Sequence, residues 1–114
     1  MTTLAQTSLA LARTYIEKGW TRGTYARDHF NAPCRVDDDS ATKFCALGAV
    51  TKVSLDSPDR ISMQITLGWA LEKAAEQLGV DPAISTYNDG PFRTKEEILA
   101  LFDAALRILE TGEF

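Results

Sequence analysis

Histidine and cysteine are scarce in this sequence. It has one histidine and two cysteines in 114 residues. A structural zinc site takes four ligands, mostly from these two residue types, so the sequence predicts no metal site. No motif indicates another cofactor.

Long hydrophobic runs are also missing. A helix needs roughly 18 or more apolar residues to cross a membrane, and no such run is present. The N-terminus lacks a basic region ahead of a continuous apolar segment, which a signal peptide would have. We therefore expect a cytoplasmic protein without membrane contact, in which Cys34 and Cys45 are free thiols.

Positive charge is outnumbered by negative charge. The chain has 12 Lys and Arg against 16 Asp and Glu, a net charge of −4. Non-specific binding to nucleic acid or to anionic lipid needs clustered basic residues. The sequence thus predicts no direct nucleic-acid binding, whereas an acidic surface suits a basic protein partner.

What is present is the composition of an ordinary soluble domain. Hydrophobic residues make up 45% and charged residues 25% of the chain, and the length fits one domain, residues 1–114. Apolar spacing predicts an all-α fold: a single compact four-helix domain with a central buried helix and two irregular connecting segments. The expected helices cover about Thr3–Lys18, Asp37–Val53, Asp59–Leu78 and Thr94–Glu110.

The second of these helices is the expected centre of the domain. Its uncharged run Phe44–Val50 is apolar nearly all round at helical spacing, which is typical of a helix buried on all sides. Asp39 or Ser40 is expected to cap it. Thr94 and Glu97 predict a capping box on the last helix.

The two irregular segments are Trp20–Asp39 and Val80–Arg93, where Gly, Pro and Asn interrupt the helical pattern. Thr24–Phe30 in the first segment predicts a short helix. Gly19 followed by Trp20 predicts a helix stop with a left-handed glycine. No alternation of apolar and polar residues is long enough to predict a strand.

Cys45 has two interpretations. With His29 as base, oriented by Asp28 or Asp89, it would be a thiol nucleophile. Its expected place in the middle of an apolar helix instead favours an inert core thiol, so we assign no catalytic residue. The cluster 37–39 lacks the spacing of a calcium loop and is expected to be a solvated helix cap.

The turn Asn88–Pro91 and the nearby aromatic residues form the candidate binding site. Asn and Asp make turns by local hydrogen bonding, but here they precede a helix N-terminus, where a polar ligand can dock. The aromatic residues plug the ends of the bundle, line a cleft, or form an exposed protein-binding patch. The predicted binding residues are Tyr87, Asn88, Asp89, Trp20 and Trp69.

Several motifs together resemble a small helical family of unknown function from bacteria and phages. They are Trp20, Asp39-Ser40-Ala41, the Cys-Ala-Leu-Gly-Ala run after Phe44, Asn88-Asp89-Gly90-Pro91 with Arg93-Thr94, and Leu101-Phe102 with Ala104-Ala105. A Trp usually precedes the cysteine in that family, whereas Phe44 does so here. The resemblance implies a compact helical domain, often phage-encoded or prophage-linked, and brings no established activity.

These observations favour a non-enzymatic helical interaction protein, in particular a phage or mobile-element accessory or anti-defence protein that binds a host protein. The alternative is a small-molecule-binding or hydrolytic protein that uses a cleft near Cys45, His29 and Asp89. A homo-oligomer joined by exposed aromatic residues is the third interpretation. A deep pocket holding the three named residues favours the enzyme, and an acidic face with exposed aromatic residues favours the protein partner.

Overall fold

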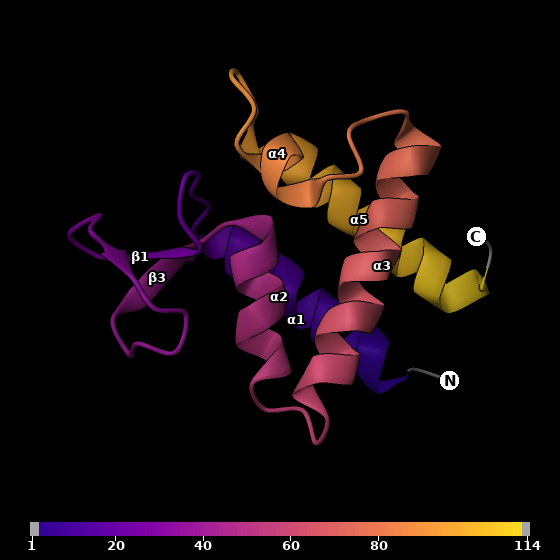
Figure 1. Ribbon diagram of the computed structural model, residues 1–114, viewed down its shortest axis with the longest axis horizontal. Helices are drawn as coiled ribbons and strands as arrows, with labels where there is room; N and C mark the ends of the chain where they lie inside the picture. The colour runs from indigo at the N-terminus through magenta and orange to yellow at the C-terminus, as the bar shows by residue number, and fades with distance from the viewer. Residues whose placement is uncertain (1–2, 113–114) are drawn as a thin grey trace.

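The computed structural model describes residues 3–112 of the chain. Helices make up most of it, and a small sheet projects from one side (Figure 1). The elements are α1 (Leu4–Lys18), β1 (Ala26–Asp28), β2 (Pro33–Cys34), β3 (Ala41–Phe44), α2 (Ala46–Ser54), α3 (Arg60–Leu78), α4 (Ile84–Asn88) and α5 (Lys95–Thr111). Within residues 3–112, no helix has both the length and the hydropathy to span a membrane.

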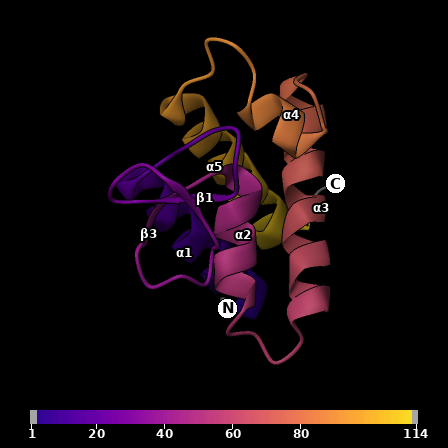
Figure 2. The ribbon, with the colours of Figure 1, turned by 60° about the vertical axis from the view of Figure 1, so that its left-hand side comes forward.

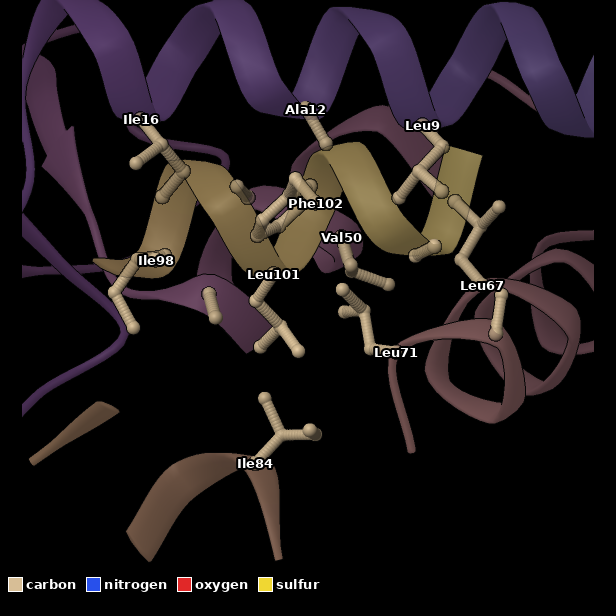
Figure 3. Packing of buried hydrophobic residues seen from close by; sticks show 14 of the residues in the cluster. Leu9, Ala12, Ile16, Val50, Leu67, Leu71, Ile84, Ile98, Leu101 and Phe102 are labelled. Carbon is tan, nitrogen blue, oxygen red and sulfur yellow. The ribbon is translucent and has the colours of Figure 1, made fainter. Parts of the chain in front are cut away.

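The hydrophobic core is a single cluster to which every helix contributes. Leu9 and Ile16 lie two turns apart on α1 and face Phe102 of α5, and all three are fully buried (Figure 3). Ile84 of α4 points toward Leu101 of α5 and closes one end of the core. The burial of these apolar side chains is the main force that holds the helices together.

Three of the predicted helices are confirmed, and so is the predicted capping box of the last one. Thr3 caps α1 through a capping box, and Asp59 caps α3. At α5 the Glu97 N–H donates to Thr94 Oγ1 at 3.2 Å, and the Thr94 N–H donates to Glu97 Oε1 at 3.0 Å. Gly79 ends α3 in the left-handed conformation, φ 72°. These contacts satisfy backbone groups that a helix end leaves without partners.

The prediction of a purely all-α fold is wrong, because three antiparallel strands form a sheet in the order β2-β1-β3. Ala26 in the middle strand lies opposite Cys34 on one side and Phe44 on the other. The short helix expected over Thr24–Phe30 is therefore wrong as well. The strands have only two to four residues, which is too short for an alternating pattern to reveal them.

The central helix begins later than predicted. The segment Ala41–Phe44 is strand β3, and α2 starts only at Ala46. A short apolar run fits a buried strand as well as a buried helix, and Phe44 is 1% exposed within its strand. The remaining helix is buried over most of its surface, in agreement with the prediction.

The expected cap of the central helix is also wrong. Ser40 N–H donates to Asp38 Oδ1 at 2.9 Å, so the acidic cluster shapes a turn before β3. Strand β3 separates Asp39 and Ser40 from the start of α2. Cys45 takes the cap position instead, and its Sγ accepts a hydrogen bond from Gly48 N–H at 3.2 Å.

Two glycines allow backbones to approach closely. A Cβ at Gly48 would collide with the carbonyl oxygen of Tyr25, and a Cβ at Gly19 would collide with that of Thr42. The prediction of a left-handed Gly19 is wrong, because its φ is −169°. Space, and not backbone angle, therefore requires glycine at both positions.

Gly48→Ala should lower the free energy of unfolding by about 1–3 kcal/mol, because the added methyl group overlaps the Tyr25 carbonyl. Gly68→Ala is the matched control, since Gly68 also lies in a helix but a Cβ there would meet nothing within 4 Å. That change should raise the free energy of unfolding by about 0.5–1 kcal/mol. Urea denaturation measures both, and stabilisation by both changes would contradict the close approach at Gly48.

Candidate functional site

Three parts of the chain meet at one end of the helical layer: the segment 19–25, the start of α2, and α4 with the turn that follows it. Figure 2 shows the start of α2 between β1 and α4. A hollow of about 280 Å³ lies here, which we call the loop cleft. It is lined by Gly23, Thr24, Tyr25, Cys45, Ser85 and Asp89.

Asn88 joins the three parts, and its side chain is only 1% exposed. Its Oδ1 accepts hydrogen bonds from Trp20 Nε1 at 2.9 Å and from Ala46 N–H at 3.0 Å. Its Nδ2 donates to the Thr21 carbonyl at 3.1 Å and to Asp89 Oδ1 at 3.0 Å. A side-chain amide has two donor hydrogens and two acceptor lone pairs, so Asn88 is fully satisfied within the protein.

Asp89 and Gly90, at the edge of the loop cleft, accept hydrogen bonds from the segment before β1. Asp89 Oδ1 accepts a hydrogen bond from Gly23 N–H at 3.0 Å, and Arg22 Nη1 donates to the Gly90 carbonyl at 3.0 Å. The Asp89 side chain is exposed and lines the loop cleft. A polar ligand in the cleft would therefore meet a carboxylate whose orientation the backbone already fixes.

The other predicted binding residues have structural contacts. Tyr87 is 5% exposed, and the Arg93 guanidinium lies 3.8 Å from its ring centroid and donates to its carbonyl at 2.8 Å. Trp20 is half-buried with its indole N–H bonded to Asn88. Trp69 is half-buried on α3 against the core and does not line the loop cleft. Of the five predicted residues, Asp89 is the one that lines the cleft.

Cys45 lies at the N-terminus of α2, which corrects its expected place in the middle of a helix. It lines the loop cleft, although only 7% of the residue is exposed. Burial raises the pKa of the Cys45 thiol, and the Asp89 carboxylate adds to this rise, while hydrogen bonds from the amides of Gly48 and Leu47 oppose it. The net rise keeps the thiol protonated at neutral pH.

His29 lies outside the loop cleft. It is exposed in the turn between β1 and β2, where its ring centroid lies 4.1 Å from that of Phe30. A thiol nucleophile needs a base to take its proton or a lowered pKa, and Cys45 has neither in this arrangement. The cleft is better suited to bind a polar group through Asp89 and the Ser85 hydroxyl.

The acidic cluster forms a surface turn. Arg35 Nε donates to Asp37 Oδ1 at 2.9 Å, and this contact lowers the pKa of Asp37. Hydrogen bonds from the Ser40 amide and hydroxyl lower the pKa of Asp38. Within residues 3–112, no group of three or more His, Cys, Asp or Glu side chains is placed to hold a metal ion.

Sequence reasoning missed three residues that line the loop cleft, Gly23, Thr24 and Ser85. Tyr25 also lines it, and this residue belongs to the aromatic residues for which the lining of a cleft was one of the interpretations. Gly23 has a φ of 81° and marks a turn, which is the one local signal that the sequence offers. Ser85 belongs to α4, whose five residues are too few for helical periodicity to detect.

Residues 1–108 match the model of DUF6197, a family of unknown function. The chain belongs to this family. The expected membership of a family of unknown function is thereby confirmed. Neither a curated protein nor a solved structure matches the chain. Membership of DUF6197 brings no activity with it.

Iodoacetamide should label Cys34 before Cys45 in the native protein at pH 7. Cys34 is half-buried and Cys45 is buried, and burial raises the pKa of both thiols, so access decides the order. Because the thiolate is the reacting form, labelling of both should speed up as the pH rises toward the raised pKa values. Peptide mass spectrometry follows each site. Labelling of Cys45 ahead of Cys34 would contradict its burial and its protonated state.

Proposed function

We propose that this chain is a non-enzymatic interaction protein that binds a protein partner through the outer face of α3. A second apolar stripe on this helix carries the proposal. Ile61 and Ile65, one turn apart, are 67% and 66% exposed, while Leu67 and Leu71 on a neighbouring stripe are fully buried. A helix with an exposed apolar stripe beside its buried one is suited to a second apolar contact.

A third exposed apolar side chain lies at the start of α1. Leu4 is 56% exposed and, together with Met63, lines a hollow of about 250 Å³ between the first turns of α1 and α3. In Figure 2, α3 lies at the outer edge of the helical layer. We call Ile61 and Ile65 the α3 patch.

Carboxylates surround the α3 patch. Asp56 and Asp59 precede α3, and Glu72 lies on its outer stripe two turns after Ile65. All three side chains are exposed, and none of them is ion-paired within residues 3–112. Arg60 and Lys73 are the cations adjacent to these carboxylates in the sequence. An apolar patch bordered by carboxylates suits a partner that presents Lys and Arg around apolar side chains.

The loop cleft supports the non-enzymatic part of the proposal, because its thiol is protonated and no histidine lines it. The small size and the net charge of −4 further support an accessory or anti-defence protein of phage or mobile-element origin. Such a protein would cover a basic surface of a host protein by charge complementarity.

The test combines Ile61→Ser with Ile65→Ser. Both side chains are exposed, so each change should alter the free energy of unfolding by no more than about 0.5 kcal/mol while removing the apolar contact. The matched control combines Leu11→Ser with Leu78→Ser, two leucines that are 48% and 47% exposed elsewhere on helices. Each tagged protein is cross-linked in a lysate of the source cells, and captured proteins are quantified by mass spectrometry.

The proposal predicts a protein with a basic surface that the wild type and the leucine control retain and the isoleucine variant loses. Equal capture by all three proteins contradicts the α3 patch. Sedimentation velocity tests whether the wild type forms a dimer that the isoleucine variant does not form. Such a result would show that the patch binds a second copy of this chain, and it would contradict a different protein as the partner.

The loop cleft supports a second candidate function, binding of a small polar molecule. Its volume of about 280 Å³ is close to the lower end of the usual range of ligand sites, about 300–1,000 Å³. Asp89 and Ser85 supply polar groups at its rim. Occupancy would shield Cys45, so slower alkylation of Cys45 in the presence of an added metabolite would support this candidate.

A further inference from the structure

A third hollow lies between the segment before β1 and the turn between β1 and β2. It measures about 420 Å³ and is lined by Trp20, Thr21, Arg22, Arg27 and Asn31, and we call it the arginine hollow. It shares no lining residue with the loop cleft or with the hollow beside the α3 patch. The inference drawn from it is therefore independent of the proposed function.

Arg27 is held in a fixed position within this hollow. It is half-buried, and its Nε donates to Thr21 Oγ1 at 2.7 Å. Its Nη1 donates to the Asn31 carbonyl at 3.2 Å, and its Nη2 donates to the Arg22 carbonyl at 3.2 Å. All three acceptors are uncharged. A guanidinium has five N–H donors, so two donors of Arg27 remain for a ligand.

Two further cations approach the same hollow. Arg22 is exposed, and its guanidinium carbon lies 5.9 Å from the ring centroid of Trp20. Its Nη1 donates to the Gly90 carbonyl at 3.0 Å. Lys43 Nζ donates to Asn31 Oδ1 at 3.1 Å, which brings its ammonium to the edge of the hollow. Both acceptors are again neutral, and four of the five N–H donors of Arg22 remain for a ligand.

These three cations form no ion pair with any carboxylate of residues 3–112. Three other arginines are ion-paired within residues 3–112: Arg13 with Asp103 at 2.6 Å, Arg35 with Asp37 at 2.9 Å, and Arg93 with Glu97 at 2.7 Å. Asp28 accepts hydrogen bonds from two amides of the β1–β2 turn, and Asp89 accepts from the Gly23 amide and from Asn88 Nδ2. Three positive charges without an ion-pair partner at one hollow attract an anion.

We propose that the arginine hollow binds the phosphate monoester group of a small molecule. Such a group carries a charge of about −1.5 to −2 near neutral pH and three acceptor oxygens. This matches the free donors of Arg22, Arg27 and Lys43, and the planar fork of arginine fits phosphate in a bidentate manner. The hollow, at about 420 Å³, lies within the usual range of small-molecule sites, about 300–1,000 Å³.

Isothermal titration calorimetry with inorganic phosphate and with adenosine 5′-monophosphate tests this site, at an ionic strength held constant with sodium chloride. The wild type should bind at least adenosine 5′-monophosphate saturably. Arg22→Gln should weaken that binding by about tenfold or more, because hydrogen bonds to charged groups are among the strong ones. Arg107→Gln removes an exposed arginine of α5 that does not line the hollow, so it should leave the affinity unchanged.

Equal affinity for the two probes would show that the site recognises the phosphate group alone. Tighter binding of adenosine 5′-monophosphate would show that it recognises a nucleotide. Both results support the site. Absence of saturable binding of either probe by the folded wild type overturns it. Equal weakening by Arg107→Gln also overturns it, because this would show general charge attraction. Lys43→Gln provides a second variant, on strand β3, and should weaken binding even if circular dichroism shows that Arg22→Gln fails to fold.

Discussion

The buried side-chain amide of Asn88 is the contact on which one end of this molecule depends. It satisfies the Trp20 indole N–H, the Thr21 carbonyl and the first amide of α2, groups that come from parts of the chain far apart in sequence. A buried polar group without a partner costs about 1–3 kcal/mol. Removal of this one side chain would leave three such groups unsatisfied, so the local fold is tied to its presence.

Much of the surrounding geometry depends on the position that Asn88 gives to the start of α2. Because the helix begins at Ala46, Cys45 becomes its cap and faces the loop cleft. Gly48 then lies against the Tyr25 carbonyl, which brings the helix onto the segment before β1. The same amide holds Trp20, a wall of the arginine hollow, so one buried residue positions both hollows without lining either.

Sequence reasoning was strongest where local rules decide the structure. The periodicity of α3 and α5 and the Thr94–Glu97 capping box depend on residues within one or two turns of each other. The sheet depends on pairing between distant segments of two to four residues, and this leaves no local signal. Asn88 was predicted as a binding residue from its turn chemistry, and that role stays a prediction. Its hydrogen bonds join residues that are far apart in the sequence, so only the structure reveals them. Ile61 and Ile65 fit the apolar spacing of α3, yet their side chains are exposed, because the sequence does not show which apolar stripe of a helix another element covers.

Hydrogen exchange of the Ala46 amide, followed by NMR, tests the central role of Asn88 most directly. The first amide of a helix has no partner within the helix and normally exchanges fast. With Asn88 Oδ1 as acceptor at 3.0 Å, the Ala46 amide should instead exchange as slowly as the core amides of α5, and far more slowly than the equivalent first amide at Lys95. This protection should disappear in Asn88→Ala. An Ala46 amide that exchanges as fast as that of Lys95 in the wild type would contradict the account.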